Sequence, residues 1–525
     1  MVAITHHLRF LCGMLALGLL PACATVGVRK APPPLPADPF ERALMAYVRG
    51  DLEQATADLQ EVIRSHPEDL RARDLLQAVY QEKGGSLALS PPPPLTLLLP
   101  QPASPERIMQ IVLGRNPEIR KAIFQIIEAR ARLREAQVDF GPEFSLLTRF
   151  HPLGVFTTLT QSILDGIWGR KARMHQAEES LLASVANYTR VRMAILDSAL
   201  NSYLQFLEAE ELIEVLKAEL QVREEQRRVA SLRSQHGTLL SPDLLAIEQG
   251  LAATQQKLAE ARKSLEVART TLNGLMGRRV DAPLSLQPKR VVVAVPEDVR
   301  QAITRARSQR PELQEAQAQL AEAQAGHEII RTRLPRIELR TTYGASSREG
   351  RGDFFMGSST GLRFSTPLLI WPLQKARSAR EAALVKQLEM EVAAWQTRLA
   401  VEAVEAYQKL QEAQKRFVTA VKQSEEAREA LRIARAVDRW GKGEERFTLL
   451  AAQIKQSEAH QQLIRRDYAI QRASLQLQRV MGTLPERVIF TSPAPNRQEE
   501  DRSPRPHPDR ALWAWHPAFL QEPQE

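Results

Sequence analysis

Residues 104–484 carry the same succession of sequence patterns twice, about 200 residues apart, and this duplication constrains the fold more than any other feature. Asn116-Pro117-Glu118 opens the first copy and Arg310-Pro311-Glu312 opens the second. Each opening precedes a segment rich in Ala, Gln and Glu, a pair of alternating segments, and a long stretch without Gly or Pro. The sequence therefore predicts two copies of one unit, repeat 1 over residues 104–286 and repeat 2 over residues 287–484.

The Gly- and Pro-free stretches Arg170–His236 and Leu373–Trp440 are predicted to be single helices, each about 100 Å long at 1.5 Å per residue. Apolar residues recur mostly at steps of three, four and seven in the second stretch, which predicts a coiled-coil seam that needs a partner helix. That seam consists of Leu384, Leu388, Trp395, Leu399, Tyr407, Leu410, Phe417 and Val421. After a glycine-containing break, a shorter helix is expected to return antiparallel in each repeat.

The alternating segments predict two β-hairpins. In repeat 2, apolar and polar residues alternate over Ile337–Ala345 and Met356–Phe364, and repeat 1 shows a weaker alternation over Phe144–Phe150 and Val155–Ile163. Each segment has about the 9–11 residues that cross a bilayer as a tilted strand. Four strands cannot close a barrel, and open sheet edges are not tolerated in hydrocarbon. We therefore expect three copies to pool four strands each in a trimeric 12-stranded transmembrane barrel. The expected fold class is mainly α with a small β part.

Composition argues against two functional classes. Charged residues make up 25% of the chain and aromatic residues 5%, a mixture typical of long paired helices. The 71 basic and 62 acidic residues, which give a net charge of +9, are interleaved, so no nucleic-acid partner is expected. No phosphate loop, metal-ligand spacing or nucleophile elbow is found, so we expect no enzyme, no catalytic or metal-binding residues and no cofactor.

Residues 1–22 have the charge order and apolar run of a secretory signal peptide. The run ends Leu20-Pro21-Ala22-Cys23, which resembles the lipobox of bacterial lipoproteins and implies a covalent lipid, including palmitate, on Cys23. Ala24 follows, and by the same resemblance the absence of Asp there implies transfer to the outer membrane. An ordinary secretory signal with a coincidental cysteine is the alternative. Cys12, the second cysteine, would leave with the signal, so no internal disulfide is expected.

Two proline-rich linkers, residues 23–36 and 86–103, bracket a segment that is predicted to form three amphipathic helices over residues 37–85. Gly50-Asp51, Ala55, Leu59 and Pro67 in this segment resemble part of a tetratricopeptide repeat, and a generic helical hairpin is an equal alternative. The proline-rich tail, residues 485–525, is predicted to be disordered.

The duplicated opening, the strand hairpins and the long Ala/Gln/Glu helices together resemble the TolC-like outer-membrane efflux protein family, over about residues 104–484. Cys23 suggests its lipoprotein branch in tripartite efflux systems. The resemblance implies a homotrimer, lipid-anchored in the outer membrane with a large periplasmic part. It also implies a periplasmic adaptor and an inner-membrane transporter as partners. The implied function is the passive exit duct of a tripartite efflux or type I secretion system. A lipid-anchored periplasmic coiled-coil adaptor or scaffold without a channel is the alternative.

The same resemblance implies that the turns between the long and returning helices, here called the tips, bind the adaptor and gate the duct. Ser241 and Pro242 are expected at the N-cap and first position of the returning helix. The candidate adaptor-binding residues are Leu232, Arg233, Gly237, Leu239, Ser241, Asp243, Arg439, Trp440, Gly441 and Gly443. Glu444 and Glu445 are gate candidates, because Thr448 and Ala451 stand where the best-known family member carries acids. Alternatively, the glycines only serve the turns.

Overall fold

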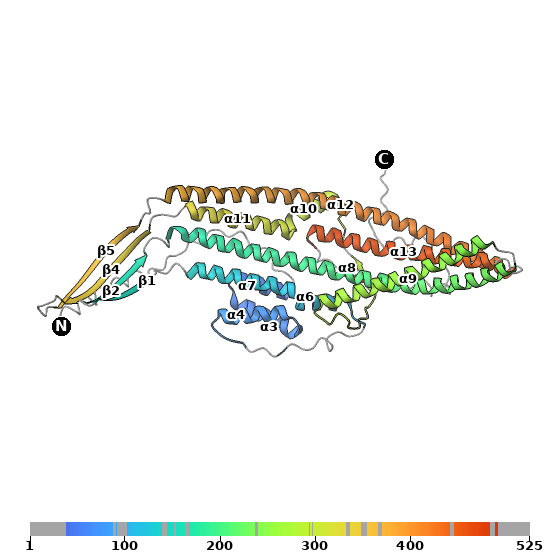
Figure 1. Cartoon of the computed structure of the whole chain (residues 1–525), viewed down its shortest axis with the longest axis horizontal. Coiled ribbons are helices and arrows are strands. Elements are labelled where there is room, and N and C mark those ends of the chain that lie inside the picture. Colours follow the sequence, from blue (N-terminus) through green and yellow to red (C-terminus); the bar gives the residue numbers. More distant parts are fainter. Residues whose placement is uncertain are drawn as a thin grey trace.

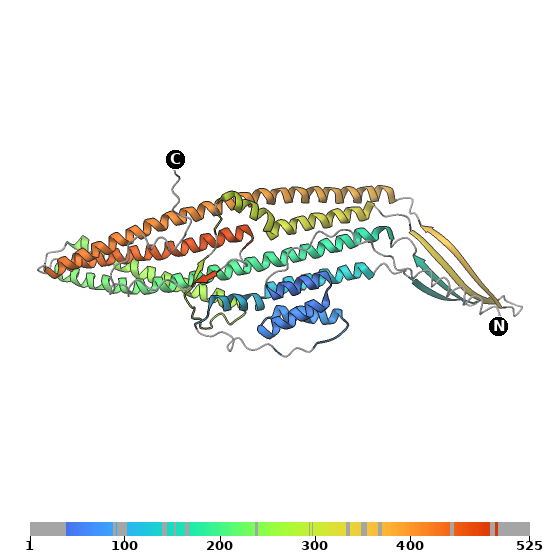
Figure 2. The same ribbon diagram turned by 180° about the vertical axis from the view of Figure 1, so that it is seen from behind.

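The computed structural model describes residues 38–87, 91, 102–138, 144–151, 154–162, 167–236, 240–292, 295–296, 298–331, 336–347, 354–365, 370–440, 446–483 and 489–491. The chain forms a long helical slab with strands at one end and the tips of two helical hairpins at the other (Figures 1 and 2). These two ends are called the strand end and the tip end below.

The same order of elements occurs twice. Repeat 1 contains α6 (Pro105–Arg115), α7 (Pro117–Val138), β1 (Phe144–His151), β2 (Gly154–Ser162), α8 (Ile167–Gln235) and α9 (Ser241–Leu275). Repeat 2 contains α10 (Val299–Gln309), α11 (Pro311–Arg331), β4 (Arg336–Ser347), β5 (Phe354–Ser365), α12 (Ile370–Trp440) and α13 (Arg446–Met481). The short helices α6 and α10 were not predicted from the sequence.

The prediction of two very long helices is confirmed, since α8 spans 69 residues and α12 spans 71. Each begins three residues before the predicted start. Pro372 does not prevent this in α12, because the first-turn N–H groups have no acceptor within the helix. The antiparallel return is also confirmed, as α9 packs on α8 and α13 packs on α12. Both return helices end at a glycine with positive φ, Gly277 at 67° and Gly482 at 74°.

The strands form one antiparallel sheet in the order β1-β2-β4-β5. The two hairpins, β1–β2 and β4–β5, come from different repeats and join through β2 and β4, where Val155 pairs with Ala345. This joining leaves β1 and β5 as the two edges of the sheet within the chain.

The helices follow the same lateral order as the strands. In the half near the strand end, neighbouring helices follow the order α7-α8-α11-α12, and in the half near the tip end they follow α9-α8-α13-α12 (Figure 1). One edge of the slab is therefore β1, α7 and α9, and the opposite edge is β5 and α12. We call these the α7/α9 edge and the α12 edge.

A second, two-stranded sheet corrects the prediction for the tail. β3 (Arg290–Val292) pairs antiparallel with β6 (Ile489–Thr491), which lies inside the segment 485–525 that was predicted to be disordered. Ile489, Phe490 and Thr491 are strong strand formers, and the many prolines that follow obscured this short run.

The prediction of three helices before repeat 1 is confirmed by α2 (Pro39–Arg49), α3 (Leu52–Ser65) and α4 (Leu70–Glu82). Asp38, Asp51 and Asp69 cap them by accepting hydrogen bonds from first-turn backbone N–H groups. We call these helices the N-terminal module. Its apolar side chains form one continuous core with α7 and α8, which includes Leu181 and Tyr188 of α8.

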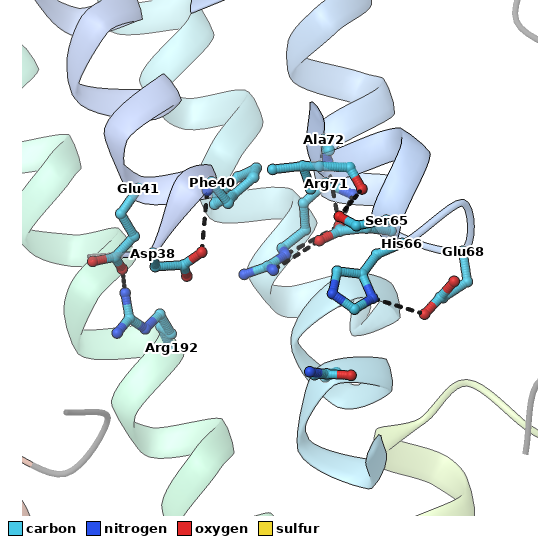
Figure 3. Close-up of polar contacts among 12 residues, drawn as sticks. Asp38, Phe40, Glu41, Ser65, His66, Glu68, Arg71, Ala72 and Arg192 are labelled. Carbon is cyan, nitrogen blue, oxygen red and sulfur yellow. Dashed lines mark hydrogen bonds and ion pairs between the residues drawn. The ribbon is translucent and has the colours of Figure 1, made fainter. Parts of the chain in front are cut away.

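Arginines of repeat 1 hold the N-terminal module through its acidic residues. Arg130 of α7 donates to both carboxylate oxygens of Glu82, at 3.1 and 2.8 Å, and its guanidinium lies 4.8 Å from the Tyr47 ring centroid. Further ion pairs between repeat 1 and the module are Arg120–Asp74, Arg107–Glu68, Arg134–Glu82 and Arg192–Glu41. Figure 3 shows the Arg192–Glu41 contact, which joins α8 to α2.

Candidate functional site

The ends of the helices of the two hairpins, α8 with α9 and α12 with α13, lie side by side at the tip end, as Figures 1 and 2 both show. The guanidinium of Arg233, near the end of α8, lies 5.4 Å from the ring centroid of Phe447 at the start of α13. Arg446 donates to Glu225 of α8 at 3.1 Å. Contacts between repeat 1 and repeat 2 therefore extend to the last turns of the hairpins.

The first tip presents apolar and charged side chains to solvent. Leu232 is 45% exposed, and Leu240, just before α9, is 72% exposed. Asp243 lies in the first turn of α9, where a carboxylate favours the positive end of the helix dipole. In the second hairpin, Arg439 is exposed in the last turn of α12, and Trp440 is the final residue of that helix.

The prediction that Ser241 is an N-cap is wrong. Leu240 is the cap residue, with extended backbone angles of −72° and 146° and no side-chain hydrogen bond. Its carbonyl already accepts from the N–H groups of Asp243 and Leu244, so the helix begins one residue earlier than expected. Ser241 is the first helical residue and Pro242 follows it.

Seven of the predicted site residues lie outside the described residues. They are Cys23, Gly237, Leu239, Gly441, Gly443 and the pair Glu444-Glu445. The structure thus brings together the tip positions Leu232, Arg233 and Asp243 with the end of α12, and the roles assigned to all of these residues stay predictions.

A buried polar junction, which no sequence pattern predicted, lies about 24 Å from the tip end of α8 at 1.5 Å per residue. Glu219 of α8 is fully buried, and its carboxylate accepts from Thr254 of α9 at 2.9 Å and from Gln461 of α13. Arg223, one turn along α8, donates to Glu219 at 2.7 Å and to Glu458 of α13 at 2.8 Å. The sequence signal for this junction was the position of Glu219, a charged residue one helical turn after the apolar Leu216, which the structure buries.

Glu219 belongs to a longer polar seam where α8 meets α13. Arg479 donates to Asp197 at 2.9 Å, Tyr468 donates to Glu211 at 2.9 Å, and Arg472 pairs with Glu208. By contrast, α8 packs on α9 through an apolar core that includes Leu204, Leu258 and Leu272. The same apolar core includes Ile464 and Leu475 of α13, so the two hairpins are joined by hydrophobic burial and, in addition, by this row of ion pairs and hydrogen bonds.

Burial raises the pKa of two acidic residues at this seam. It raises the pKa of Asp467, although the Arg290 guanidinium, 3.2 Å away, acts in the opposite direction. Burial likewise raises the pKa of Glu211, which accepts the hydrogen bond from Tyr468. These carboxylates therefore lower the stability of the slab when they are ionised.

Among the described residues, no group of His, Cys, Asp and Glu side chains is arranged to hold a metal ion. No helix in this part of the chain combines the length and the apolar composition of a membrane span.

Large apolar side chains are exposed along both edges of the slab. On the α7/α9 edge, Phe124 is 51% exposed and Leu245 is 56% exposed. On the α12 edge, Met390 is 65% exposed, Val401 52% and Ile433 55%. These side chains are exposed within the described residues, although the N-terminal module packs on another side of α7. Exposed apolar side chains on two edges are typical of association surfaces.

Comparison with known proteins accounts for this architecture. A family model described as outer membrane efflux protein matches residues 154–278 and 302–483, which together exceed half of the chain. The chain belongs to the outer membrane efflux protein family. The two matched segments begin in β2 and in α10 and end just after α9 and α13. The N-terminal module lies outside both segments.

One curated relative of this efflux protein is the pyoverdine export outer membrane protein OpmQ of Pseudomonas aeruginosa. It is 26% identical over 234 residues, and the match spans 44% of this chain and 49% of OpmQ, about half the length of that relative.

Solved channels share the fold. The outer-membrane channel OprN matches with a TM-score of 0.59 and 19% identity, over 72% of this chain and 90% of OprN. The outer membrane protein VceC of Vibrio cholerae matches with a TM-score of 0.58 and 15% identity, over 72% and 96%. The MtrE outer membrane channel of Neisseria gonorrhoeae matches with a TM-score of 0.57 and 18% identity, over 72% and 89%.

Proposed function

We propose that three copies of this chain form the passive exit duct of a tripartite efflux or type I secretion system in the outer membrane. The observation that carries the proposal is the shared lateral order of strands and helices. β1 lies on the same edge as α7 and α9, and β5 lies on the same edge as α12. A ring of copies that joins these edges would close the sheet and the helical wall together.

The strands support a shared barrel in this proposal. β1 leads away from α7 and β5 leads back to α12, so β1 of one copy and β5 of the next would run antiparallel. Three copies would supply twelve strands, and closure removes the unpaired edges that hydrocarbon does not solvate. Cys23, which follows the lipobox-like Leu20-Pro21-Ala22, would add a lipid anchor at this end.

The tips support a partner at the opposite end. The duct contributes no energy of its own, so an inner-membrane transporter has to drive export, and a periplasmic adaptor has to link that transporter to the tips. Leu232 and Leu240 offer exposed apolar contacts, while Arg233 and Arg439 add positive charge to the same end of the slab. The candidate gate acids Glu444 and Glu445 follow Arg439 by five and six residues in the sequence.

The test of the duct uses the full-length protein purified from outer membranes. We expect a trimeric mass in detergent and ion conductance after reconstitution in planar bilayers. A monomer without conductance would contradict the duct and favour an anchored adaptor or scaffold.

The test of the tips combines Arg233→Glu and Arg439→Glu with Gly237→Leu. Trimer formation should persist, because Arg233 and Arg439 lie at the ends of α8 and α12 that are far from the strands, and Gly237 follows Arg233 by four residues in the sequence. Efflux and adaptor cross-linking in cells should be lost. Wild-type efflux together with wild-type cross-linking would show that the tips are only turns.

A further inference from the structure

We propose that neighbouring copies join in one specific register, in which Phe124 on α7 packs against Met390 on α12 of the next copy, and Glu128 lies beside Lys386. This inference rests on the proposed ring of copies and names the residues that form its seams. The occupant of each edge is a second copy of this chain.

The side chains of Met390 and Phe124 point away from the packed parts of the slab. Successive residues of a helix are about 100° apart, so Met390, nine residues before the buried Leu399, lies about 180° around α12 from it. Met390 thus faces away from the rest of the slab. On α7, the buried Ile119, Ile123 and Ile126 face the N-terminal module and α8, and Phe124 remains 51% exposed beside them. Both side chains point outward from opposite edges.

The heights of Phe124 and Met390 along the slab can be compared by following contacts from helix to helix. Asn187 of α8 donates to Gln125 of α7 at 2.8 Å, which sets the level of Phe124 on α8. Arg190, one turn further along α8, donates to Glu315 of α11 at 3.0 Å.

From α11 the trace continues to α12. His327 of α11 contacts Ser378 of α12 at 3.1 Å, and Gln374 donates to the Ile330 carbonyl at 3.1 Å. Counting back from these contacts along the antiparallel helices places Met390 level with Phe124 to within about one helical turn of 5.4 Å.

The rotational symmetry of the ring determines which residues of neighbouring copies meet. Rotation about an axis parallel to the long helices keeps every residue at its height, so residues at equal height on opposite edges come together. α7 and α12 run in opposite directions, and Glu128 and Lys386 each lie one turn nearer the strand end than Phe124 and Met390. The same register therefore brings an exposed carboxylate, 61% accessible, next to an exposed ammonium, 75% accessible.

The tip end repeats this match. Leu245 lies about 6 Å from the tip end of α9 and Ile433 about 10 Å from the tip end of α12, at 1.5 Å per residue. Leu245 is 56% exposed and Ile433 is 55% exposed. The register fixed by Phe124 thus also places apolar side chains opposite one another near the tips.

Paired cysteines test the register in the full chain within outer membranes. Phe124→Cys combined with Met390→Cys should give covalent trimers after mild oxidation. The matched control is Phe124→Cys with Val401→Cys, because Val401 is exposed on the same helix but lies about 16 Å further from Met390 toward the tips. The control should give few covalent trimers.

The outcomes separate this inference from the proposed function. Trimers in detergent that cross-link through residues 124 and 401, or through neither pair, would overturn the register and leave the duct intact. An absence of trimers by mass would overturn both.

A charge exchange tests the same register without cysteines. Glu128→Lys alone and Lys386→Glu alone should each lower the temperature at which the trimer dissociates, because each places like charges side by side. The double variant should restore most of that loss. A double variant no better than the single variants would overturn the pairing.

Discussion

Repeat 1 and repeat 2 share one succession of elements, but only repeat 1 carries the N-terminal module. Arg120 and Arg130 lie three and thirteen residues after Pro117, the first residue of α7. The same distances from Pro311 in α11 lead to Gln314 and Gln324. The arginines that bind Asp74 and Glu82 thus have uncharged counterparts in repeat 2. The charged contacts of α7 with the N-terminal module therefore have no equivalent in α11.

The junctions before α7 and α11 differ in a second way. Asn116 caps α7 by accepting from the Glu118 and Ile119 N–H groups, and it donates to the Leu275 carbonyl at 3.2 Å. In repeat 2 its place is taken by Arg310, which donates to the Arg479 carbonyl at 3.1 Å and to Glu312 at 2.7 Å. Both residues tie the junction to the end of the return helix, with an amide in one case and a buried guanidinium in the other.

The largest effect is expected from Arg130→Ala. Glu82 would lose a bidentate partner while both side chains of this pair are under 10% exposed, and breaking such a pair costs about 3 kcal/mol or more. Limited proteolysis should then release the N-terminal module. The matched control is Gln324→Ala in α11, which should leave protease resistance unchanged. Equal resistance of both variants would show that the apolar core alone holds the module.

The two terminal glycines should differ in sensitivity. A Cβ at Gly482 would lie 2.7 Å from the Gln309 carbonyl oxygen, whereas a Cβ at Gly277 meets nothing closer than 4.0 Å. Both positions have positive φ, so Gly277→Ala should cost about 1 kcal/mol and Gly482→Ala about 2–4 kcal/mol. Urea unfolding of the detergent-solubilised variants measures both. A larger cost for Gly277→Ala would contradict the observed packing.

Exchanging the junction residue of repeat 2 for that of repeat 1, Arg310→Asn, should cost about 1–2 kcal/mol, because the hydrogen bonds to Glu312 and the Arg479 carbonyl are lost. Thermal unfolding checks this value against Asn116→Ala, which removes a helix cap worth about 1 kcal/mol. If Arg310→Asn proved neutral, the two junction residues would be interchangeable.

The smallest effect concerns the seam between the repeats and depends on pH. Burial raises the pKa of Asp467, so its ionised form is less favourable in the folded protein than in the unfolded chain. The contribution of Asp467 to the free energy of unfolding therefore falls as pH rises from about 4, the ordinary carboxyl range, through the raised pKa. Asp467→Asn should be more stable than the wild type at neutral pH, and the difference should disappear in acid. Unfolding measured from pH 4 to 8 tests the sign.

Local patterns predicted most of the fold. The absence of Gly and Pro predicted α8 and α12, and the period-two alternation lies where β4 and β5 are found. Both patterns depend only on residues that are close together in the sequence. Ser241 failed as an N-cap because a helix can begin one residue earlier whenever a backbone carbonyl, here that of Leu240, accepts the first bonds. β6 was missed because its three residues form a strand only against β3, which lies about 200 residues earlier in the chain.

The sequence by itself determined that this chain has two repeats, long hairpins and a helical N-terminal module, since periodicity and glycine placement act through neighbouring residues. Only the tertiary structure decided that the module packs on α7 and α8, that Glu219 is buried between three helices, and that α12 forms one whole edge of the slab. These features depend on contacts between residues far apart in the chain. Such contacts form only where burial and charge pairing across the folded slab offset the loss of conformational entropy, and no local pattern encodes that balance.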